Sequence, residues 1–281
     1  MDILIQVSPV DAAYAPAPDG AGGTIPPHAA YALDLAASRS GRLTVLVFEI
    51  TNLAGEEEDE AEMVREAQGE TTPAQRAMAG ILSRAAAAHG VPVEIVTGRN
   101  YAFTIAETLA DYARLSDLVV IGTQGPLTFP RKHLADHILF DTGRPVLLVP
   151  GQAQCAASTI VVAWDASRAA TRALHDAMPL LQGADRVLVT TIHDGGDARA
   201  GQSGVELCRR LAQRGINAEF TGIERQGRQI GACITAFCAH SGADLLVMGA
   251  KRHARLRDLV YGSASHMIFD AGPALPVLMA N

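Results

Sequence analysis

The feature that most constrains this chain is an internal repeat about half as long as the chain itself. Residues 117–122 (DLVVIG) return as 244–249 (DLLVMG), an offset of 127, and residues 137–143 (HILFDTG) return as 266–272 (HMIFDAG), an offset of 129. Solenoid repeats have periods of roughly 20–50 residues. An offset of this size therefore predicts two whole domains of similar fold.

Each repeat contains five short apolar runs rich in β-branched residues. Most of them are apolar throughout, which is typical of strands in a parallel sheet that helices cover on both faces. We therefore expect strands at residues 3–7, 43–48, 93–96, 118–121 and 146–149 in the first repeat, and at 160–162, 187–189, 218–221, 245–248 and 277–279 in the second.

Stretches with helical patterning lie between the runs. Alternation of strand and helix predicts βαβ units with right-handed crossovers, and therefore the α/β class. We expect one domain at residues 1–150 and another at 158–281, joined by the small, polar segment 150–158. The helical stretches are residues 75–88, 104–115, 169–181, 204–214 and 231–240.

Charge is concentrated in one segment. The chain has 23 Lys and Arg against 30 Asp and Glu, a net charge of −7, and residues 56–70 alone hold eight acids and one base, which sum to −7. The remainder is neutral and lacks the basic stripe that is typical of nucleic-acid-binding proteins, so we expect no nucleic acid partner. The acidic segment has two interpretations, a solvated helix entry or a docking surface for a basic partner.

The cysteines and the hydropathy pattern indicate a compartment. The four cysteines all lie in the second half and form no C-x-x-C pair, which argues against a disulfide framework and favours a reducing environment. No apolar run approaches the roughly 20 residues that span a bilayer. The first residues carry no basic n-region of a signal peptide. We therefore expect a cytoplasmic protein with no membrane partner.

A glycine and a carboxylate each follow a predicted strand of the second repeat. Gly249 ends the fourth strand, and Asp165 follows the first. Ligands of open parallel sheets bind beyond the carboxyl ends of the strands, where glycine lets the backbone approach closely and helix N–H groups attract anions. Two interpretations stay open. The pair marks a phosphate and ribose site, or it is an ordinary turn glycine and a helix-capping Asp.

Residues 160–168 (IVVAWDASR) resemble the opening of universal stress protein domains. The segment from Met248 to Ser263 resembles the nucleotide signature of that family, G-x2-G-x9-G-S/T, and residues 276–279 (PVLM) resemble its last strand. The resemblance covers nearly the whole chain as two tandem copies. It implies two tandem doubly wound α/β domains, each a five-stranded parallel sheet of order 3-2-1-4-5 flanked by helices. It also implies ATP as a ligand, with or without Mg²⁺, because many members bind it; other members lack the signature and do not.

Carried over by position, the resemblance implies an adenosine site in the second domain. Asp165 would contact the adenosine, with Ala163 and Trp164 beside it. Ile192, at the end of the second strand, would contact the base through its backbone. Trp164 is the single tryptophan of the chain, and the alternative interpretation is that it packs in the core without contacting a ligand.

The resemblance also implies a phosphate site. Met248 and Gly249 would flank the ribose and the phosphates. The phosphates themselves would be held by the N–H and hydroxyl groups of Gly262, Ser263, Ala264 and Ser265.

The second domain departs from the signature at one position. Arg252 replaces the second glycine, since nine residues separate it from Gly262. Its side chain could pair with phosphate, or it could fill the space that a glycine leaves open. The neighbouring loop is basic, which favours pairing.

The first domain departs further. It keeps the first half of the signature at residues 122–125 (GTQG), but Ala135 and Asp136 stand where Gly and Ser are expected, and Ser8 stands where the second domain has Asp165. A carboxylate at that place would repel phosphate. We therefore expect a degenerate first domain that does not bind ATP.

These observations favour a cytoplasmic stress-response or regulatory protein that binds ATP or a related nucleotide in its second domain. The main alternative is a scaffold or interaction protein in which neither domain binds a nucleotide. A nucleotide-handling enzyme is a weaker alternative. No catalytic or metal-binding residue is expected, and slow hydrolysis is the most that we attribute to the chain. We expect the two domains to form an intramolecular pseudo-dimer. A homodimer and an unknown protein partner are further possibilities.

Overall fold

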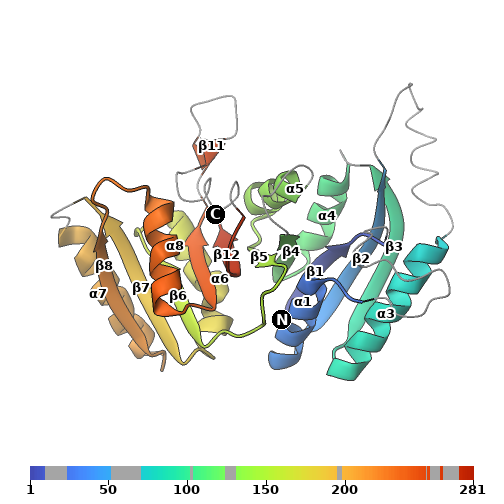
Figure 1. The fold of residues 1–281 in the computed structure, drawn as a ribbon, viewed down its shortest axis with the longest axis horizontal. Helices are drawn as coiled ribbons and strands as arrows, with labels where there is room; N and C mark the ends of the chain where they lie inside the picture. Colours follow the sequence, from blue (N-terminus) through green and yellow to red (C-terminus); the bar gives the residue numbers. More distant parts are fainter. Residues whose placement is uncertain are drawn as a thin grey trace. The chain divides into compact units, whose positions relative to one another are not determined.

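The computed structural model describes residues 1–9, 24–51, 71–101, 104–123, 131–194, 198–250, 252–253, 260–261 and 272–281. The chain forms two compact units, whose main division lies between Arg144 and Pro145 (Figure 1). In each unit, helices pack against a series of mostly parallel strands.

The first unit has strands in the order β3-β2-β1-β4, and every neighbouring pair is parallel. The central strands β1 and β4 are buried along most of their length, as continuous apolar runs require. Its elements are β1 (Asp2–Val7), α1 (Pro27–Ser38), β2 (Arg42–Thr51), α3 (Pro73–His89), β3 (Val93–Tyr101), α4 (Ile105–Arg114), β4 (Leu118–Thr123), α5 (Arg131–His137) and a π-helical turn η1 (Ile138–Thr142).

The main strands of the second unit have the order β5-β12-β9-β6-β7-β8, and β10 and β11 form a separate two-stranded sheet. All neighbouring pairs of the main strands are parallel except β5 and β12, which are antiparallel. In Figure 1, α8 lies in front of these strands, and α6 and α7 lie behind them. The elements are β5 (Val146–Pro150), β6 (Thr159–Ala163), α6 (Arg168–Leu181), β7 (Arg186–His193), α7 (Ala198–Ala212), β8 (Ala218–Glu224), α8 (Ile230–Ser241), β9 (Leu245–Gly249), β10 (Arg252–His253), β11 (Val260–Tyr261) and β12 (Val277–Ala280).

The α/β fold with helices on a parallel sheet is confirmed, and each of the ten expected apolar runs lies within a strand. The domain bounds stay a prediction. Strand β5 ends the first sequence repeat and pairs antiparallel with β12, within the second compact unit. One detail differs from expectation. Helix α1 was not expected, because the proline-rich segment before it suggests a loop. Pro27 instead occupies the first helical turn, where its missing N–H costs nothing.

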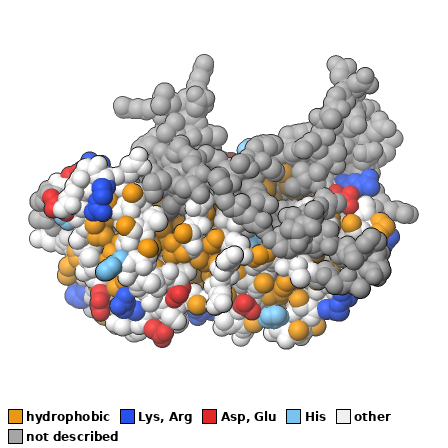
Figure 2. Space-filling model, viewed as in Figure 1, with side chains coloured by type: hydrophobic (Ala, Val, Ile, Leu, Met, Phe, Trp, Pro, Cys, Tyr) orange, Lys and Arg blue, Asp and Glu red, His pale blue; other side chains and the backbone are white. Residues whose placement is uncertain are grey.

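The visible surface carries charges of both signs. On the face in Figure 2, Lys and Arg side chains are interspersed with Asp and Glu over the described part of the second unit. Among the described residues, no helix combines the length and the apolar character that a membrane span needs.

Candidate ligand site at the end of β6 and β9

Strands β6 and β9 are adjacent and parallel, so they end at the same edge of the sheet. Ala163, the last residue of β6, is in register with Met248 of β9. Trp164 and Asp165 follow Ala163, and Gly249 follows Met248. The register therefore brings these five predicted site residues together at the carboxyl edge, where ligands of open parallel sheets bind. We call this edge of the second unit the crevice.

Gly249 is required by close packing. A Cβ at this position would lie 2.6 Å from the backbone nitrogen of Ala170 and 2.7 Å from the carbonyl carbon of Ala169. Both residues belong to the first turn of α6, so only glycine lets this turn approach β9 so closely. The glycine therefore holds the N-terminus of α6 at the crevice, where the N–H groups of a first helical turn favour anions.

Asp165 shapes the turn that leads into α6. Its Oδ1 accepts a hydrogen bond of 3.0 Å from the backbone N–H of Ser167, as in an Asx turn. Ala166, between them, has a left-handed φ of 56°. The helix cap itself is Ser167, whose Oγ accepts from the backbone N–H of Ala170 at 3.2 Å. Asp165 is thus a turn residue with an exposed side chain and not the capping residue.

Trp164 connects the crevice to α7. Its indole Nε1 donates to Ser203 Oγ at 2.9 Å, and its carbonyl accepts from Thr191 Oγ1 at 2.7 Å. The half-buried Ile192 follows Thr191 near the end of β7, so it lies on the other side of β6 from Gly249. Core packing alone does not describe Trp164, because its polar atoms have defined partners. The hydroxyls of Thr191 and Ser203 could not be identified from the sequence as partners of Trp164, since they lie 27 and 39 positions further along the chain and no local pattern links them to it.

The remaining part of the predicted signature follows β9. Arg252 begins β10, and its backbone pairs antiparallel with Tyr261 of β11. The pairing therefore brings Arg252 next to Tyr261, the residue that precedes Gly262 at the far end of the nine-residue spacing of the signature. The predicted phosphate residues Gly262, Ser263, Ala264 and Ser265 lie outside the described residues.

A glycine occupies the matching place in the first unit, but a side chain packs on it. A Cβ at Gly122, near the end of β4, would lie 2.5 Å from His28 Nδ1. The other ring nitrogen of His28, Nε2, lies 3.1 Å from the carbonyl oxygen of Gln6 in β1. The imidazole therefore connects β1 and β4 near their ends, and in both units the first turn of a helix packs on the glycine.

The other matching positions of the first unit also lack phosphate ligands. Ala135 and Asp136 are buried on α5, with 0% and 6% of their surfaces exposed. A buried carboxylate at this place disfavours an anion nearby. Ser8, the counterpart of Asp165, is half-buried and carries no charge. The degeneracy of the first unit stays a prediction.

The described residues give little support for a reactive cysteine or for a metal site. Burial raises the pKa of the Cys208 thiol to about 11 and that of the Cys238 thiol to about 12, so both stay protonated at neutral pH. No group of three or more His, Cys, Asp or Glu in the described ranges is placed to hold a metal ion.

The crevice residues fit the nucleoside part of a nucleotide. An exposed carboxylate can accept hydrogen bonds from ribose hydroxyls, and a half-buried indole next to it offers an apolar surface to a base. The first turn of α6 supplies N–H groups of the polarity that an anion needs.

No protein-family model matches the chain, and no curated protein matches it. Solved structures do match it over its whole length. A universal stress protein from Archaeoglobus fulgidus superposes with a TM-score of 0.69 and 14% identity, covering 100% of this chain and 98% of the other. A putative universal stress protein from Pseudomonas aeruginosa gives a TM-score of 0.56 and 16% identity over 99% of this chain and 92% of the other.

The same architecture also occurs in a different setting. The cytoplasmic domain of a prokaryotic cation chloride cotransporter matches with a TM-score of 0.51 and 12% identity, covering 99% of this chain and 95% of the other. At such low identities the likeness establishes the fold and leaves the function to the residues of the site.

Proposed function

On the premise that the chain has the universal-stress-protein fold, we propose that it is a stress-response or regulatory protein that binds ATP or a related adenine nucleotide. The site is the crevice of the second unit. The observation that carries this proposal is the register of Ala163 with Met248, because it puts the residues that follow β6, among them Asp165, at the same edge of the sheet as Gly249, on which the N-terminus of α6 packs. We place its action in the cytoplasm, in keeping with its cysteine pattern.

In this proposal the nucleoside lies at the ends of β6 and β7. Asp165 accepts hydrogen bonds from the ribose hydroxyls. Trp164 and Ala163 border the base, and Ile192 contacts it through the backbone. The exposure of the Asp165 side chain and the partial burial of Trp164 support these roles.

The phosphates lie towards β9 and the residues that follow it. Met248 and Gly249 border them, and Arg252 pairs with them, because a guanidinium binds phosphate oxygens in a bidentate manner. Mg²⁺ would accompany the phosphates as part of the nucleotide. The N–H and hydroxyl groups of the phosphate loop come from Gly262, Ser263, Ala264 and Ser265.

We propose that the first unit does not bind nucleotide. The His28 side chain packed on Gly122 and the buried Asp136 support this assignment. Pairing of β5, from the first sequence repeat, with β12, from the second, supports the prediction that a tandem chain pairs its two repeats internally. Formation of a homodimer stays a prediction.

A scaffold or interaction protein is the second candidate. It is favoured by Arg252, which stands where the family signature has glycine. Under this alternative neither unit binds a nucleotide, and the chain acts through a protein partner. Hydrolysis of the nucleotide is not part of either proposal.

Calorimetric titration with ATP, with and without Mg²⁺, tests the proposal. We expect one site per chain, and binding at least about tenfold weaker in Asp165→Ala, because a lost hydrogen bond to a charged group costs roughly 1.5–3 kcal/mol. The control is Asp111→Ala, since Asp111 is an exposed carboxylate of the first unit whose side chain is 78% exposed. Absence of saturable binding would favour the scaffold, and two sites per chain would contradict the assignment of the first unit.

A further inference from the structure

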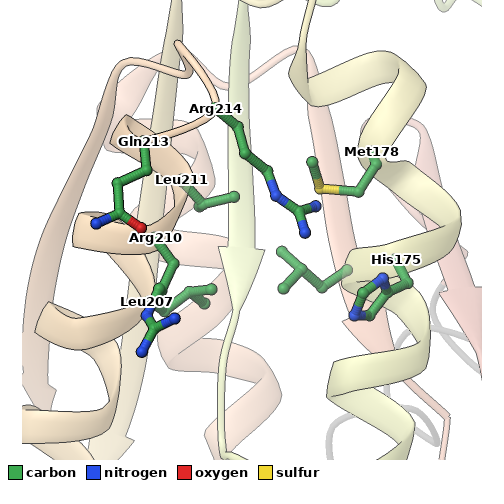
Figure 3. Close-up of a pocket in the computed structure, with 8 residues that line it drawn as sticks. His175, Met178, Leu207, Arg210, Leu211, Gln213 and Arg214 are labelled. Atoms are coloured by element: carbon green, nitrogen blue, oxygen red, sulfur yellow. The ribbon is translucent and has the colours of Figure 1, made fainter.

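The second unit contains a cavity between α6 and α7. It is a groove of about 380 Å³, a size within the range of small-molecule sites. Figure 3 shows side chains of both helices converging on it. It is lined by Leu174, His175, Met178, Leu207, Arg210, Leu211, Gln213 and Arg214.

The floor of the groove is apolar. Leu174 and Leu211 are buried at its base, with 7% and 2% of their surfaces exposed, and Met178 and Leu207 are half-buried beside them. Methionine adapts its shape to a ligand because its side chain is unbranched and flexible. An apolar floor of this kind favours a hydrocarbon or aromatic body.

The rim of the groove is polar and carries no acidic residue. It is formed by the exposed side chains of His175, Arg210, Gln213 and Arg214. Arg210 is already paired, since its Nε lies 2.7 Å from Glu206 Oε1. Arg214 has no carboxylate partner among the residues that the structure describes. In Figure 3 it extends from the end of α7 towards α6, so its guanidinium overhangs the floor.

The carbonyl groups at the end of α7 have backbone partners of their own. The carbonyl of Leu211 accepts from the N–H groups of Arg214 and Ile216 at 2.9 and 3.1 Å, and that of Ala212 accepts from Gly215 at 3.0 Å. These carbonyl groups therefore do not require the guanidinium of Arg214 as a donor.

The groove is separate from the crevice. Helix α6 begins at the crevice with Arg168, and Met178 lies ten residues further along, which is about 15 Å at 1.5 Å per residue. A ligand of the groove therefore does not compete with a nucleotide for the same atoms.

We propose that the groove between α6 and α7 binds a small amphipathic carboxylate, with its apolar body on the leucine and methionine floor and its carboxylate paired with Arg214. Charge complementarity carries this choice, because Arg214 on the rim has no carboxylate partner in the described part of the chain and the floor is lined by apolar side chains. A neutral ligand would leave the guanidinium unpaired, and a purely inorganic anion would leave the floor empty.

Nuclear magnetic resonance of the full chain with ¹³C-methyl methionine tests this proposal, with decanoate as the probe. The chain has seven methionines, and Met178→Leu assigns the signal of the groove. We expect decanoate to shift the Met178 signal saturably, and Arg214→Gln to weaken binding about tenfold. Arg84→Gln is the control, since Arg84 is an exposed arginine on α3 of the first unit. Saturating ATP should leave the decanoate titration unchanged, which keeps this test independent of the nucleotide proposal.

Three results would overturn the proposal. The first is a Met178 signal that decanoate does not move. The second is decanol binding as tightly as decanoate with no effect of Arg214→Gln, which would indicate a purely apolar cleft. The third is inorganic phosphate moving the signal as decanoate does, which would indicate an anion site without an apolar body.

Discussion

The indole Nε1 of Trp164 donates a 2.9 Å hydrogen bond to the hydroxyl of Ser203, which ties the end of β6 to helix α7. Trp164 is the single tryptophan of the chain, and it precedes Asp165 at the crevice. One fluorophore therefore reports on the proposed nucleotide site.

We expect ATP to change the fluorescence of Trp164 saturably, over the same concentration range as the calorimetric binding. A base placed beside the indole changes the polarity around it, and therefore its emission. The change should be lost or shifted to higher concentration in Asp165→Ala, and it should persist in Asp111→Ala. Emission that stays constant while calorimetry detects binding would place the nucleotide away from Trp164.

Gly249→Ala should destabilise the protein by about 1–3 kcal/mol, the range for overpacking. The new Cβ would lie 2.6 Å from the backbone nitrogen of Ala170, and backbone in a helix cannot move away cheaply. Gly201→Ala is the control, because a Cβ on this α7 residue meets nothing within 4 Å. That control should be neutral or more stable, since alanine favours a helix. Urea unfolding measures both, and equal stability of the two variants would contradict the packing role of Gly249.

Ser167→Ala should lower the free energy of unfolding by about 1 kcal/mol, because the hydroxyl caps α6 through the N–H of Ala170. Ser83→Ala, at an exposed site on α3, should stay within about 0.5 kcal/mol of the parent.

Ser167→Asp separates capping from ligand binding. Aspartate also caps helices well, so stability should be close to that of the parent. Its added negative charge at the crevice should nevertheless weaken ATP binding. Unchanged ATP affinity in Ser167→Asp would argue that the phosphates lie away from the N-terminus of α6.

Glu206 on α7 should titrate at unusually low pH. Hydrogen bonds from Arg209 and Arg210 lower the pKa of its carboxyl from the ordinary 4.5 to about 2. Because this pKa is depressed in the folded state, the stabilisation is present above pH 4.5 and is lost as the pH falls towards 2. Carboxyl ¹³C shifts measured against pH give the value directly. Arg209→Gln and Arg210→Gln should each raise it, and so should high salt, since the carboxylate is exposed.

The central strands could be predicted from the sequence because they are buried on both faces. Runs such as residues 245–248 are apolar at every position, and the structure buries all four. Helix α1 could not be foreseen in the same way, because the prolines at 26 and 27 look like a loop until their place at the helix start is known. Asp165 and Gly249 could be predicted as neighbours, since adjacent parallel strands end at one edge.

By itself, the sequence determined the α/β class and the places of the strands along the chain, because these follow from local runs of apolar residues. Tertiary structure alone decided which side chains meet. The bond from Trp164 to Ser203, the imidazole of His28 on Gly122 and the pairing of β5 with β12 join residues far apart in the chain. Such contacts depend on how helices pack on the sheet and on which strand edge is left to hydrogen-bond, and no local pattern encodes either.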